Sequence, residues 1–406
     1  MKKLIFLFVS KDKFPPFRVD VAVLFKDKMI SRGHRIDWIL QSEAPTKQPK
    51  IIIWEGDKVF LGATDNGTSK IKRLKKHIHR ICNDFNMFSA FKKKQYDFIL
   101  VKDLIISALI AIITSKINKS KLVYWLSYPF PESAIYEVQN GTARFPMLYW
   151  IRGHITKLIL YRVILPIVDH IFVQSDQMKI DIIKEGAIEK KITPVPMGVS
   201  IKNIPFFNYD KKKDDKKEKI ILYLGTLIKI RRMTFLVKVL NIVLGQFKDT
   251  KLYLVGGGQE PSDEQIIIDE ARKNGIEDKI VITGNLPQKE AWQYVKEADV
   301  CLSPYYPIPI LNSTSPTKII EYMAMGKAVV ANDHPEQKLV LEESGAGICV
   351  PYDEKKFADA IILLLRDKKK AQIMGTLGRK YAEEKRDYEK IANIVEDQLL
   401  LLTDRS

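Results

Sequence analysis

Residues 303–330 read SPYYPIPILNSTSPTKIIEYMAMGKAVV and predict a polar loop, a short helix and a buried strand in that order. Ser315 is a favourable N-cap, Pro316 suits the first helical position, and Gly326 is a natural stop. The run 328–331 is short and apolar, as expected for a strand that is buried on both faces. The stretch therefore predicts one unit of an α/β domain, in which a loop leaves a strand and opens a helix.

The first turn of this helix predicts an anion-binding site. The backbone N–H groups of residues 315–318 have no partner within the helix, and Lys318 lies beside them. A phosphate is the usual occupant of such a site. Glu321, further along the same helix, is placed to accept hydrogen bonds from sugar hydroxyls. The alternative interpretation is an ordinary helix–turn–strand unit without a ligand.

The same segment resembles the donor site of retaining glycosyltransferases of the GT-B fold, in particular glycosyltransferase family four (glycosyl transferases group 1). The signature of that family is two glutamates separated by seven residues, before a segment similar to Met-Ala-x-Gly-x-Pro-Val-Val. Here Glu321 is the second glutamate, and Ser313 stands where the first is expected. The resemblance is strongest over residues 220–350, moderate over 165–200 and weak before that.

The resemblance implies an α/β protein of GT-B architecture, with two Rossmann-like domains facing across a cleft and a C-terminal helix that crosses back to the first domain. We expect a basic, acceptor-binding domain over 1–200, a linker over 201–219, a nucleotide-sugar-binding domain over 220–385 and the crossing helix over 386–406. Short β-branched runs alternate with amphipathic stretches in both halves, which itself predicts parallel sheets covered by helices. The charge run 210–219 has no apolar period and predicts an exposed linker.

The alternation of β-branched runs and amphipathic stretches predicts where each strand and helix lies. Strands are expected at 4–9, 35–40, 51–54, 58–62, 98–102, 122–125, 171–174 and 192–196, and then at 220–224, 251–255, 279–283, 299–302, 328–331 and 348–350. The pair 51–54 and 58–62 is expected to form a hairpin. Helices are expected at 19–32, 104–115, 143–165, 177–185, 357–370 and 389–402.

The net charge of +17 is concentrated in the first half of the chain. Residues 1–200 contain 33 Lys or Arg against 18 Asp or Glu, a balance of +15, whereas residues 201–406 contain 33 against 31. The densest runs are 70–80 and 92–94. This asymmetry indicates that one domain faces a polyanion such as an anionic membrane surface or a phosphorylated acceptor. The alternative is a solvated lysine-rich face. A nucleic-acid partner is not expected, because the basic runs carry no zinc-ligand spacing, aromatic motif or heptad pattern.

Composition and cysteine usage indicate the compartment. Hydrophobic residues make up 46% and charged residues 28% of the chain, as in soluble globular proteins. Three widely spaced cysteines favour a reducing environment over a disulfide framework. The apolar run 104–114 is too short to span a bilayer, and the start of the chain is better explained as a strand than as a signal peptide. We expect a cytoplasmic protein, with peripheral attachment to the inner face of the cell membrane as a further possibility.

The resemblance assigns donor-site roles in the second domain. The family usually has an arginine directly after the glycine that ends the first strand and a lysine six residues beyond it. Here the glycine is Gly225, and those two positions are Thr226 and Arg231. Arg231 can bind a phosphate in a bidentate manner, and Lys229 or Arg232 can replace the missing cation. The alternative is a basic surface turn.

Further positions complete the expected donor site. Gly257, within a run of three glycines, allows close approach of a ligand, and Leu286 is expected to contact the nucleobase. Glu321 is assigned to the donor ribose, and Ser313 to the transferred sugar. The catalytic assignment is Arg231, Lys318 and Ser313, and the remaining donor contacts are Thr314, Ser315, Pro316 and Thr317, with Asn312 as a further neutral hydrogen-bonding group.

The acceptor is expected on the first domain. Arg18, at the start of a helix after a Pro15-Pro16 loop, is expected to reach a phosphate. Ser127 lies in the loop that faces the cleft, where relatives often carry a histidine. His154 is the nearest candidate replacement, with a purely structural role as the alternative.

The predicted function is that of a hexosyltransferase. It would move a sugar from a nucleotide-diphosphate sugar, such as a UDP-sugar, to a saccharide or polyprenyl-linked acceptor, with retention, in envelope polysaccharide or glycolipid synthesis. No cofactor beyond the sugar nucleotide and no metal are expected, since the sequence has no Asp-x-Asp pair after a strand and no His/Cys cluster at metal-ligand spacing. The alternatives are a nucleotide-sugar epimerase of the same fold and a catalytically impaired binding subunit.

Overall fold

The computed structural model describes residues 2–43, 45–46, 48–64, 70–92, 94–207 and 218–404, with only the backbone given at 70, 71, 73 and 74. It divides into two compact units, residues 1–196 with 388–406 and residues 197–387. The expected boundaries lay at 200 and 386. Most of the predicted linker, residues 208–217, and Lys93 of the basic run lie outside the described residues.

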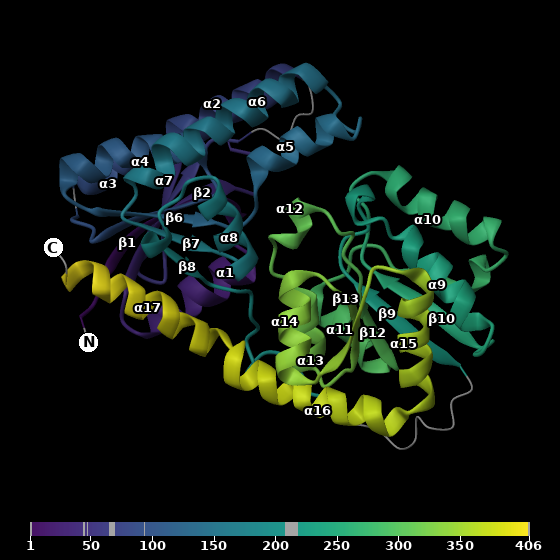
Figure 1. Ribbon diagram of the computed structural model, residues 1–406. Coiled ribbons are helices and arrows are strands. Elements are labelled where there is room, and N and C mark those ends of the chain that lie inside the picture. Colours follow the sequence, from purple (N-terminus) through teal and green to yellow (C-terminus); the bar gives the residue numbers. More distant parts are fainter. Residues whose placement is uncertain are drawn as a thin grey trace. The chain divides into compact units, whose positions relative to one another are not determined.

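The first unit is built on an eight-stranded sheet with the order β3-β4-β2-β1-β5-β6-β7-β8 (Figure 1). Its strands are β1 (Ile5–Phe14), β2 (Arg35–Ser42), β3 (Lys50–Trp54), β4 (Asp57–Gly62), β5 (Phe98–Lys102), β6 (Lys121–Leu126), β7 (His170–Val173) and β8 (Ile192–Pro194). Neighbouring strands are parallel except β3 and β4, which form the predicted antiparallel hairpin. The expected α/β class is confirmed.

Helices cover both faces of this sheet. They are α1 (Val19–Val21), the π-helix η1 (Ala22–Met29), α2 (Lys70–Asp84), α3 (Asn86–Phe91), α4 (Ile105–Asn118), α5 (Phe130–Gln139), α6 (Pro146–Ile159), the π-helix η2 (Leu160–Ile164), α7 (Leu165–Ile167), α8 (Asp176–Lys184), the turn η3 (Glu189–Lys191) and α17 (Tyr388–Asp404). The apolar face of α17 packs with η1 against the aromatic side chains Phe6, Phe8 and Trp38, so the end of the chain belongs to the first unit. Figure 1 shows α17 in yellow.

One predicted boundary in the first unit was wrong. The first strand does not end at Val9, because after a register shift Lys13 and Phe14 pair again with Gln41 and Ser42 of β2. The predicted helix 19–32 is confirmed over residues 19–31, where the single turn α1 leads into the π-helix η1 and the helix continues past Met29 to residue 31.

The second unit is built on a six-stranded, wholly parallel sheet with the order β11-β10-β9-β12-β13-β14. Its strands are β9 (Lys219–Leu224), β10 (Thr250–Val255), β11 (Ile280–Ile282), β12 (Val300–Ser303), β13 (Val329–Asn332) and β14 (Gly347–Val350). Its helices are the turn η5 (Lys229–Arg231), α9 (Thr234–Leu244), α10 (Pro261–Lys273), the turn η6 (Glu277–Lys279), α11 (Gln288–Glu297), α12 (Pro309–Asn312), α13 (Thr317–Ala324), α14 (Pro335–Ser344), α15 (Glu354–Arg366) and α16 (Lys368–Lys385).

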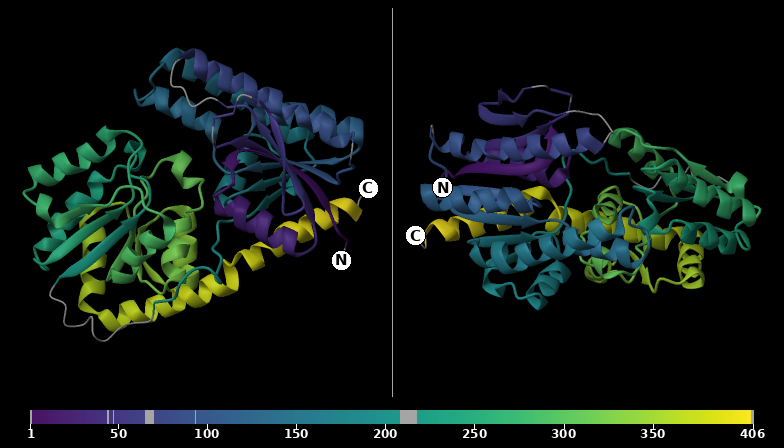
Figure 2. Two further views of the ribbon diagram at one scale, coloured as in Figure 1. Left: turned by 180° about the vertical axis from the view of Figure 1, so that it is seen from behind. Right: turned by 90° about the horizontal axis from the view of Figure 1, so that it is seen from above.

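Two apolar layers hold this second sheet. Helices α9, α10 and α15 pack on one face, and α11, α13, α14 and α16 on the other. Figure 2 shows the sheet between these layers from behind. Because the central strands β12 and β13 are buried on both faces, their carboxyl ends are the places where polar side chains become accessible, and the ends of the strands on this edge define the candidate site.

No described helix is both long enough and apolar enough to cross a membrane. The predicted basic run forms much of α2, where Lys72, Lys75 and Lys76 are exposed.

Candidate functional site

The carboxyl ends of β9 and β12 lie next to each other and lead into two loops that meet at α13. Gly225 directly follows β9 and has φ +143°, a region that favours glycine. A Cβ at this position would lie 3.2 Å from Nζ of Lys318 and 3.3 Å from the hydroxyl oxygen of Tyr223. The glycine therefore leaves the space that Lys318 occupies.

Lys318 is buried in the first turn of α13. Its Nζ donates to the hydroxyl of Tyr223 at 2.9 Å and lies 4.1 Å from the centre of that ring and 4.9 Å from the ring of Tyr305. Burial, and then the positive charge of Arg231, hold the pKa of Lys318 well below its ordinary value. Within the described residues no carboxylate lies at ion-pair distance from this ammonium group. An anion bound next to Lys318 would counteract both effects and raise the pKa of its ammonium group.

Arg231 approaches Lys318 from the turn η5. Its Nε donates to Oγ1 of Thr226 at 3.2 Å, and its guanidinium carbon lies 5.0 Å from the ring centre of Tyr305. The structure therefore brings together Gly225, Thr226, Arg231 and Lys318, as the sequence predicted. The roles assigned to them stay predictions.

The other two basic residues of this loop behave differently. The side chain of Lys229 is exposed, and its backbone N–H donates to Oδ1 of Asp263 at 3.3 Å. Arg232 has a left-handed backbone, and its guanidinium carbon lies 3.7 Å above the ring of Tyr306. Of these three basic residues, Arg231 is the one that donates a hydrogen bond to Thr226 and whose charge lowers the pKa of Lys318.

The glycine run after β10 packs against the protein itself. The carbonyl of Gly257 accepts from the N–H of Leu227 at 3.0 Å, and a Cβ on Gly257 would lie 3.0 Å from Nδ2 of Asn285. Gly256, which the sequence reading did not single out, has φ +143°, and a Cβ there would lie 2.1 Å from the carbonyl oxygen of Gly225. The run thus allows the loops after β9, β10 and β11 to approach one another.

Leu286 lies in the loop between β11 and α11, and Glu321 contacts the first residue of α11. Oε1 of Glu321 accepts from Nε2 of Gln288 at 3.0 Å. Burial raises the pKa of Glu321 to about 6, although the hydrogen bond from Gln288 and the charge of Lys318 act in the opposite direction. Leu286 is half-buried and packs on the apolar layer beneath α11 and α13. This carboxylate is therefore pre-oriented and only partly solvated.

The predicted start of the helix was one residue early. Helix α13 begins at Thr317 with Pro316 as its N-cap, and no side chain caps it. The hydroxyl of Ser315 instead accepts from the N–H of Met197 at 3.0 Å and lies 3.5 Å from Oε1 of Glu336. Its hydrogen-bonding capacity is used by a segment from elsewhere in the chain, which local sequence does not reveal.

The predicted end of the helix is a Schellman motif. The N–H of Gly326 donates to the carbonyl of Met323 at 3.0 Å, and that of Lys327 to Tyr322 at 2.9 Å. Gly326 has φ +77°.

Ser313 and Thr314 lie between the short helix α12 and α13. Ser313 is buried and ends α12, whereas Oγ1 of Thr314 donates to the carbonyl of Leu311 at 2.6 Å. Both hydroxyls lie in the loop that leads to Lys318, and the roles predicted for them toward a sugar stay predictions.

Polar residues after β13 hold the loop between β12 and α13 in place, and they were not predicted. Asn332 brackets Tyr305, since its Oδ1 accepts from the backbone N–H at 2.6 Å and its Nδ2 donates to the carbonyl at 3.0 Å. Buried His334 donates from Nε2 to the carbonyl of Leu311 at 2.8 Å, and burial lowers its pKa to about 4. The available signal was the run Asn332-Asp-His334 directly after a buried strand.

The first unit holds a separate polar cluster at the carboxyl ends of β1, β5 and β6. Arg18 donates from Nε to Oδ1 of Asp20 at 3.2 Å and from Nη2 to Oγ of Ser127 at 3.5 Å. Asp20 also forms a buried ion pair with Lys102. Burial opposes ionisation of Asp20, but Lys102 and Arg18 outweigh it and lower its pKa. The predicted pair Arg18 and Ser127 thus lies together, with the arginine already bound to a carboxylate.

Asp103 completes this cluster. It has a left-handed backbone (φ +58°), and its Oδ1 accepts from the N–H of Ser127 at 2.7 Å. Burial raises its pKa. Asp103 was not predicted, although it directly follows a buried strand.

His154 is not joined to Arg18 or Ser127 by any recorded contact within the described part of the chain. It lies exposed on α6, where its Nδ1 is 2.9 Å from the carbonyl oxygen of Trp150 and the two rings are 4.3 Å apart. This contact within α6 agrees with the alternative prediction that His154 has a purely structural role.

No group of three or more His, Cys, Asp or Glu side chains suited to a metal ion occurs among the described residues.

Comparisons with known proteins give the context for these two clusters. Residues 218–367 match the family model described as Glycosyl transferases group 1. No curated protein sequence matches the chain.

Several solved structures share the fold along the whole chain. Sucrose-phosphate synthase from Thermosynechococcus elongatus is 17% identical with a TM-score of 0.74, and 100% of each chain is covered. HepE from Anabaena, solved with UDP and glucose, is 14% identical with a TM-score of 0.69 and coverage of 98% of this chain and 99% of that one. WaaB, a lipopolysaccharide outer core galactosyltransferase, is 15% identical with a TM-score of 0.64 and coverage of 97% and 100%.

The matched segment contains the glycine loops, Arg231, Lys318 and Glu321, so the family match and the polar cluster coincide. Residues 218–367 therefore resemble a glycosyl transferases group 1 domain, and the chain as a whole has the GT-B fold that it shares with these solved structures.

Proposed function

We propose that this protein is a hexosyltransferase that takes a sugar from a nucleotide-diphosphate sugar, with UDP as the preferred nucleotide. The observation that carries the proposal is the buried ammonium group of Lys318, which lies beside Arg231 with two tyrosine rings and no ion-paired carboxylate around it in the described residues. A buried cation of this kind is costly unless it meets an anion. The structure of HepE, which holds UDP and glucose in the same fold, supports this choice of donor.

The proposed chemistry assigns the diphosphate to the two cations. When the glycosidic bond of the donor breaks, negative charge grows on the leaving diphosphate, and Arg231 and Lys318 stabilise it without moving. Because these cations are already in place, we propose transfer that does not depend on a metal ion. Glu321 accepts from the ribose, Leu286 lies against the base, and Ser313 and Thr314 face the sugar. Transfer with retention of configuration belongs to this proposal.

The proposed acceptor is a saccharide or a lipid-linked saccharide such as a polyprenyl-diphosphate-linked one. It would bind in the first unit near Arg18 and Ser127, where cationic and hydroxyl groups lie together. The positive balance of residues 1–200 suits a phosphorylated acceptor at an anionic membrane. We place the reaction in envelope polysaccharide or glycolipid synthesis, and the likeness to WaaB, a lipopolysaccharide outer core galactosyltransferase, supports that choice. The proposed location is the cytoplasmic face of the membrane.

The test is a transfer assay with a panel of nucleotide-diphosphate sugars and lipid-extract acceptors, followed by nuclear magnetic resonance of the product. We expect one donor to be consumed only when acceptor is present, and an α-linked product from an α-linked donor. An altered sugar nucleotide formed without acceptor would replace the proposal with an epimerase. Tight UDP binding without turnover across the panel would replace it with a binding subunit.

A further inference from the structure

Helix α6 presents its apolar side chains outward. The exposed fractions are 78% for Met147, 60% for Leu148, 53% for Trp150, 51% for Ile155 and 62% for Leu158. Side chains of this type are normally buried, and a continuous exposed set of them marks an interaction surface. We call these five residues, together with Phe145 and Ile151, the α6 face.

The opposite side of α6 fixes the helix to the first unit. A Cβ on Gly153 would lie 2.7 Å from Cγ1 of Ile135 and 3.2 Å from the carbonyl oxygen of Pro131, so the helix backbone packs directly on α5. Met147, Ile151, Ile155 and Leu158 follow a spacing of about four residues and therefore share the outward side. The outward direction of the α6 face is set by this close packing.

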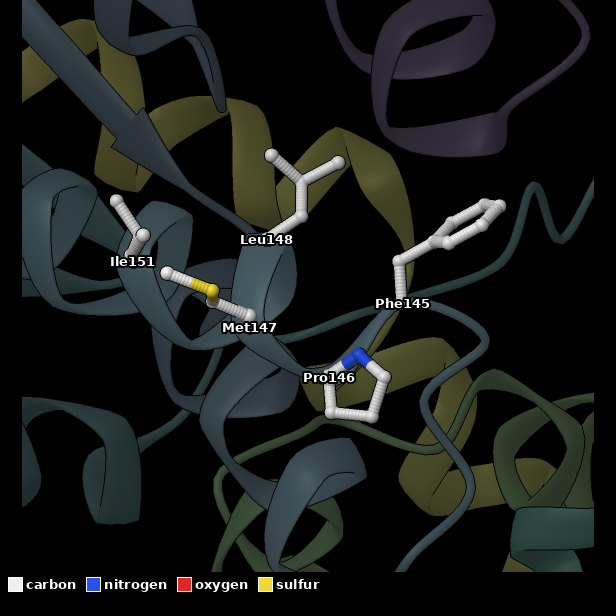
Figure 3. Close-up of a pocket in the computed structure, with 5 residues that line it drawn as sticks. All are labelled: Phe145, Pro146, Met147, Leu148 and Ile151. Atoms are coloured by element: carbon white, nitrogen blue, oxygen red, sulfur yellow. The ribbon is translucent and has the colours of Figure 1, made fainter.

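The start of α6 is hollowed. Phe145, Pro146, Met147, Leu148 and Ile151 line an open, apolar depression, and Figure 3 shows these side chains around it. A shallow apolar surface of this kind has no polar groups that would orient a small ligand. It suits flexible hydrocarbon better than a defined small molecule.

The charge around the α6 face is positive. Residues 138–168 contain four Lys or Arg and no Asp or Glu. The guanidinium carbon of Arg144 lies 5.6 Å from the ring of Phe145, and that of Arg152 lies 4.5 Å from the ring of Tyr149, so both cations border the apolar side chains. Three acidic groups lie within range of the cations of α6: Glu185 pairs with Lys157 at 2.7 Å, the half-buried Glu132 also interacts with Lys157, and Glu137 interacts with Arg152.

Helix α2 adds to this charge. Burial lowers the pKa of His77 on α2, and the positive charge of Arg152 contributes to that shift, so the two helices lie within electrostatic range. Lys75 and Lys76 of α2 are exposed. Apolar side chains, interfacial aromatic rings and flanking cations together are the features of a helix that lies in the plane of an anionic membrane surface.

We propose that the α6 face inserts into the interfacial layer of an anionic bilayer, with Trp150 at headgroup level and Arg144 and Arg152 against lipid phosphates. A second copy of this chain fits less well, because it would bring two positively charged faces together. The inference rests on the proposed function for its purpose, since a lipid-linked acceptor would lie in the same membrane. The binding itself needs neither donor nor acceptor.

The test is flotation of the full chain with vesicles of phosphatidylcholine alone or mixed with phosphatidylglycerol. The variant is Ile155→Asn with Leu158→Asn. The matched control is Ile373→Asn with Leu377→Asn on α16, where the two side chains are 53% and 41% exposed. We expect the wild type and the control to float with the anionic vesicles, and the α6 variant to bind them at least about tenfold more weakly, because two apolar side chains no longer enter the membrane.

Two further readouts separate the outcomes. The thermal shift with UDP should be the same in all three proteins, which shows that the variants fold and separates this inference from the donor proposal. Equal flotation of the α6 variant and the wild type, or no flotation of the wild type, would overturn the inference. A dimer of wild-type chains in solution that only the α6 variant loses would replace the membrane with a second copy.

Discussion

Glu321→Gln should stabilise the second unit without ligand while it weakens donor binding. In the folded protein burial raises the pKa of Glu321 from 4.5 to about 6. The folded state therefore binds this proton more tightly than the unfolded state does, and the free energy of unfolding falls as the pH rises from 4.5 to about 6. Above about pH 6 the carboxylate is charged and its burial lowers the free energy of unfolding by the full amount. An uncharged glutamine does not carry this cost.

The expected size follows from the same numbers. At about 1.36 kcal/mol for each pH unit, the difference between 4.5 and about 6 corresponds to about 2 kcal/mol. Glu321 is partly exposed, so solvent screening reduces this to about 1–2 kcal/mol. For a unit of the length of residues 197–387, such a gain raises Tm by about 2–8 °C.

The assay is calorimetric unfolding of the ligand-free protein well above pH 6 and again near pH 4.5. The exposed Glu290 on the neighbouring helix α11 gives a matched control, Glu290→Gln. We expect Glu321→Gln to be more stable than the wild type at the higher pH and equal to it at the lower pH, and to bind UDP less tightly. The reasoning is refuted if the variant is less stable at the higher pH, or if its gain is the same at both.

Three further predictions concern the same unit. Gly225→Ala should weaken UDP binding, measured by calorimetric titration, at least about tenfold, because its Cβ would lie 3.2 Å from Nζ of Lys318. Gly275→Ala, at φ +67° with no atom within 4 Å of its Cβ, is the control for a positive φ and should bind UDP normally. Arg386→Met should cost about 3–5 kcal/mol in urea unfolding, since it leaves Glu336 buried without the ion pair now at 2.9 Å; an unchanged midpoint would contradict this. UDP binding should be accompanied by uptake of a proton, because the bound anion raises the lowered pKa of Lys318, and the affinity should therefore fall as the pH approaches 10.5. Titrations in buffers of different ionisation enthalpy that show no proton uptake would contradict this prediction.

Local sequence was sufficient for most elements of the fold. Buried parallel strands such as Phe98–Lys102 are short β-branched runs between polar segments, and their ends were predicted to within a residue or two. The positions that local sequence misplaced depend on distant partners. Lys13 and Phe14 continue β1 only because β2 offers Gln41 and Ser42 as a ladder.

The candidate site also contains both residues that were predicted from the sequence and residues whose contacts depend on distant partners. Lys318 and Glu321 were predicted from their places in a helix that follows a strand, whereas Gly225 and Arg231 were assigned through the family resemblance. The parallel sheet brings the ends of these elements to one edge. Ser315 was predicted as a helix cap, but the N–H of Met197 uses its hydroxyl. Such a contact joins residues more than a hundred positions apart and leaves no periodic signal in either segment.

The supporting residues were missed for a related reason. Asn332 and His334 fix the loop that carries Tyr305 through backbone hydrogen bonds, and any polar residue after a strand has the same appearance in a sequence. Their function becomes visible only when the loop they hold is also placed.

The most direct test of the donor site is calorimetric titration of UDP into the wild type and into Lys318→Met. Lys369→Met, at an exposed lysine of α16, is the control. A charge-assisted hydrogen bond contributes about 1.5–3 kcal/mol, so we predict that UDP binds the wild type and Lys369→Met equally and Lys318→Met about 10- to 100-fold more weakly. Equal affinity of all three proteins, or a wild type that binds no nucleoside diphosphate, would contradict the account.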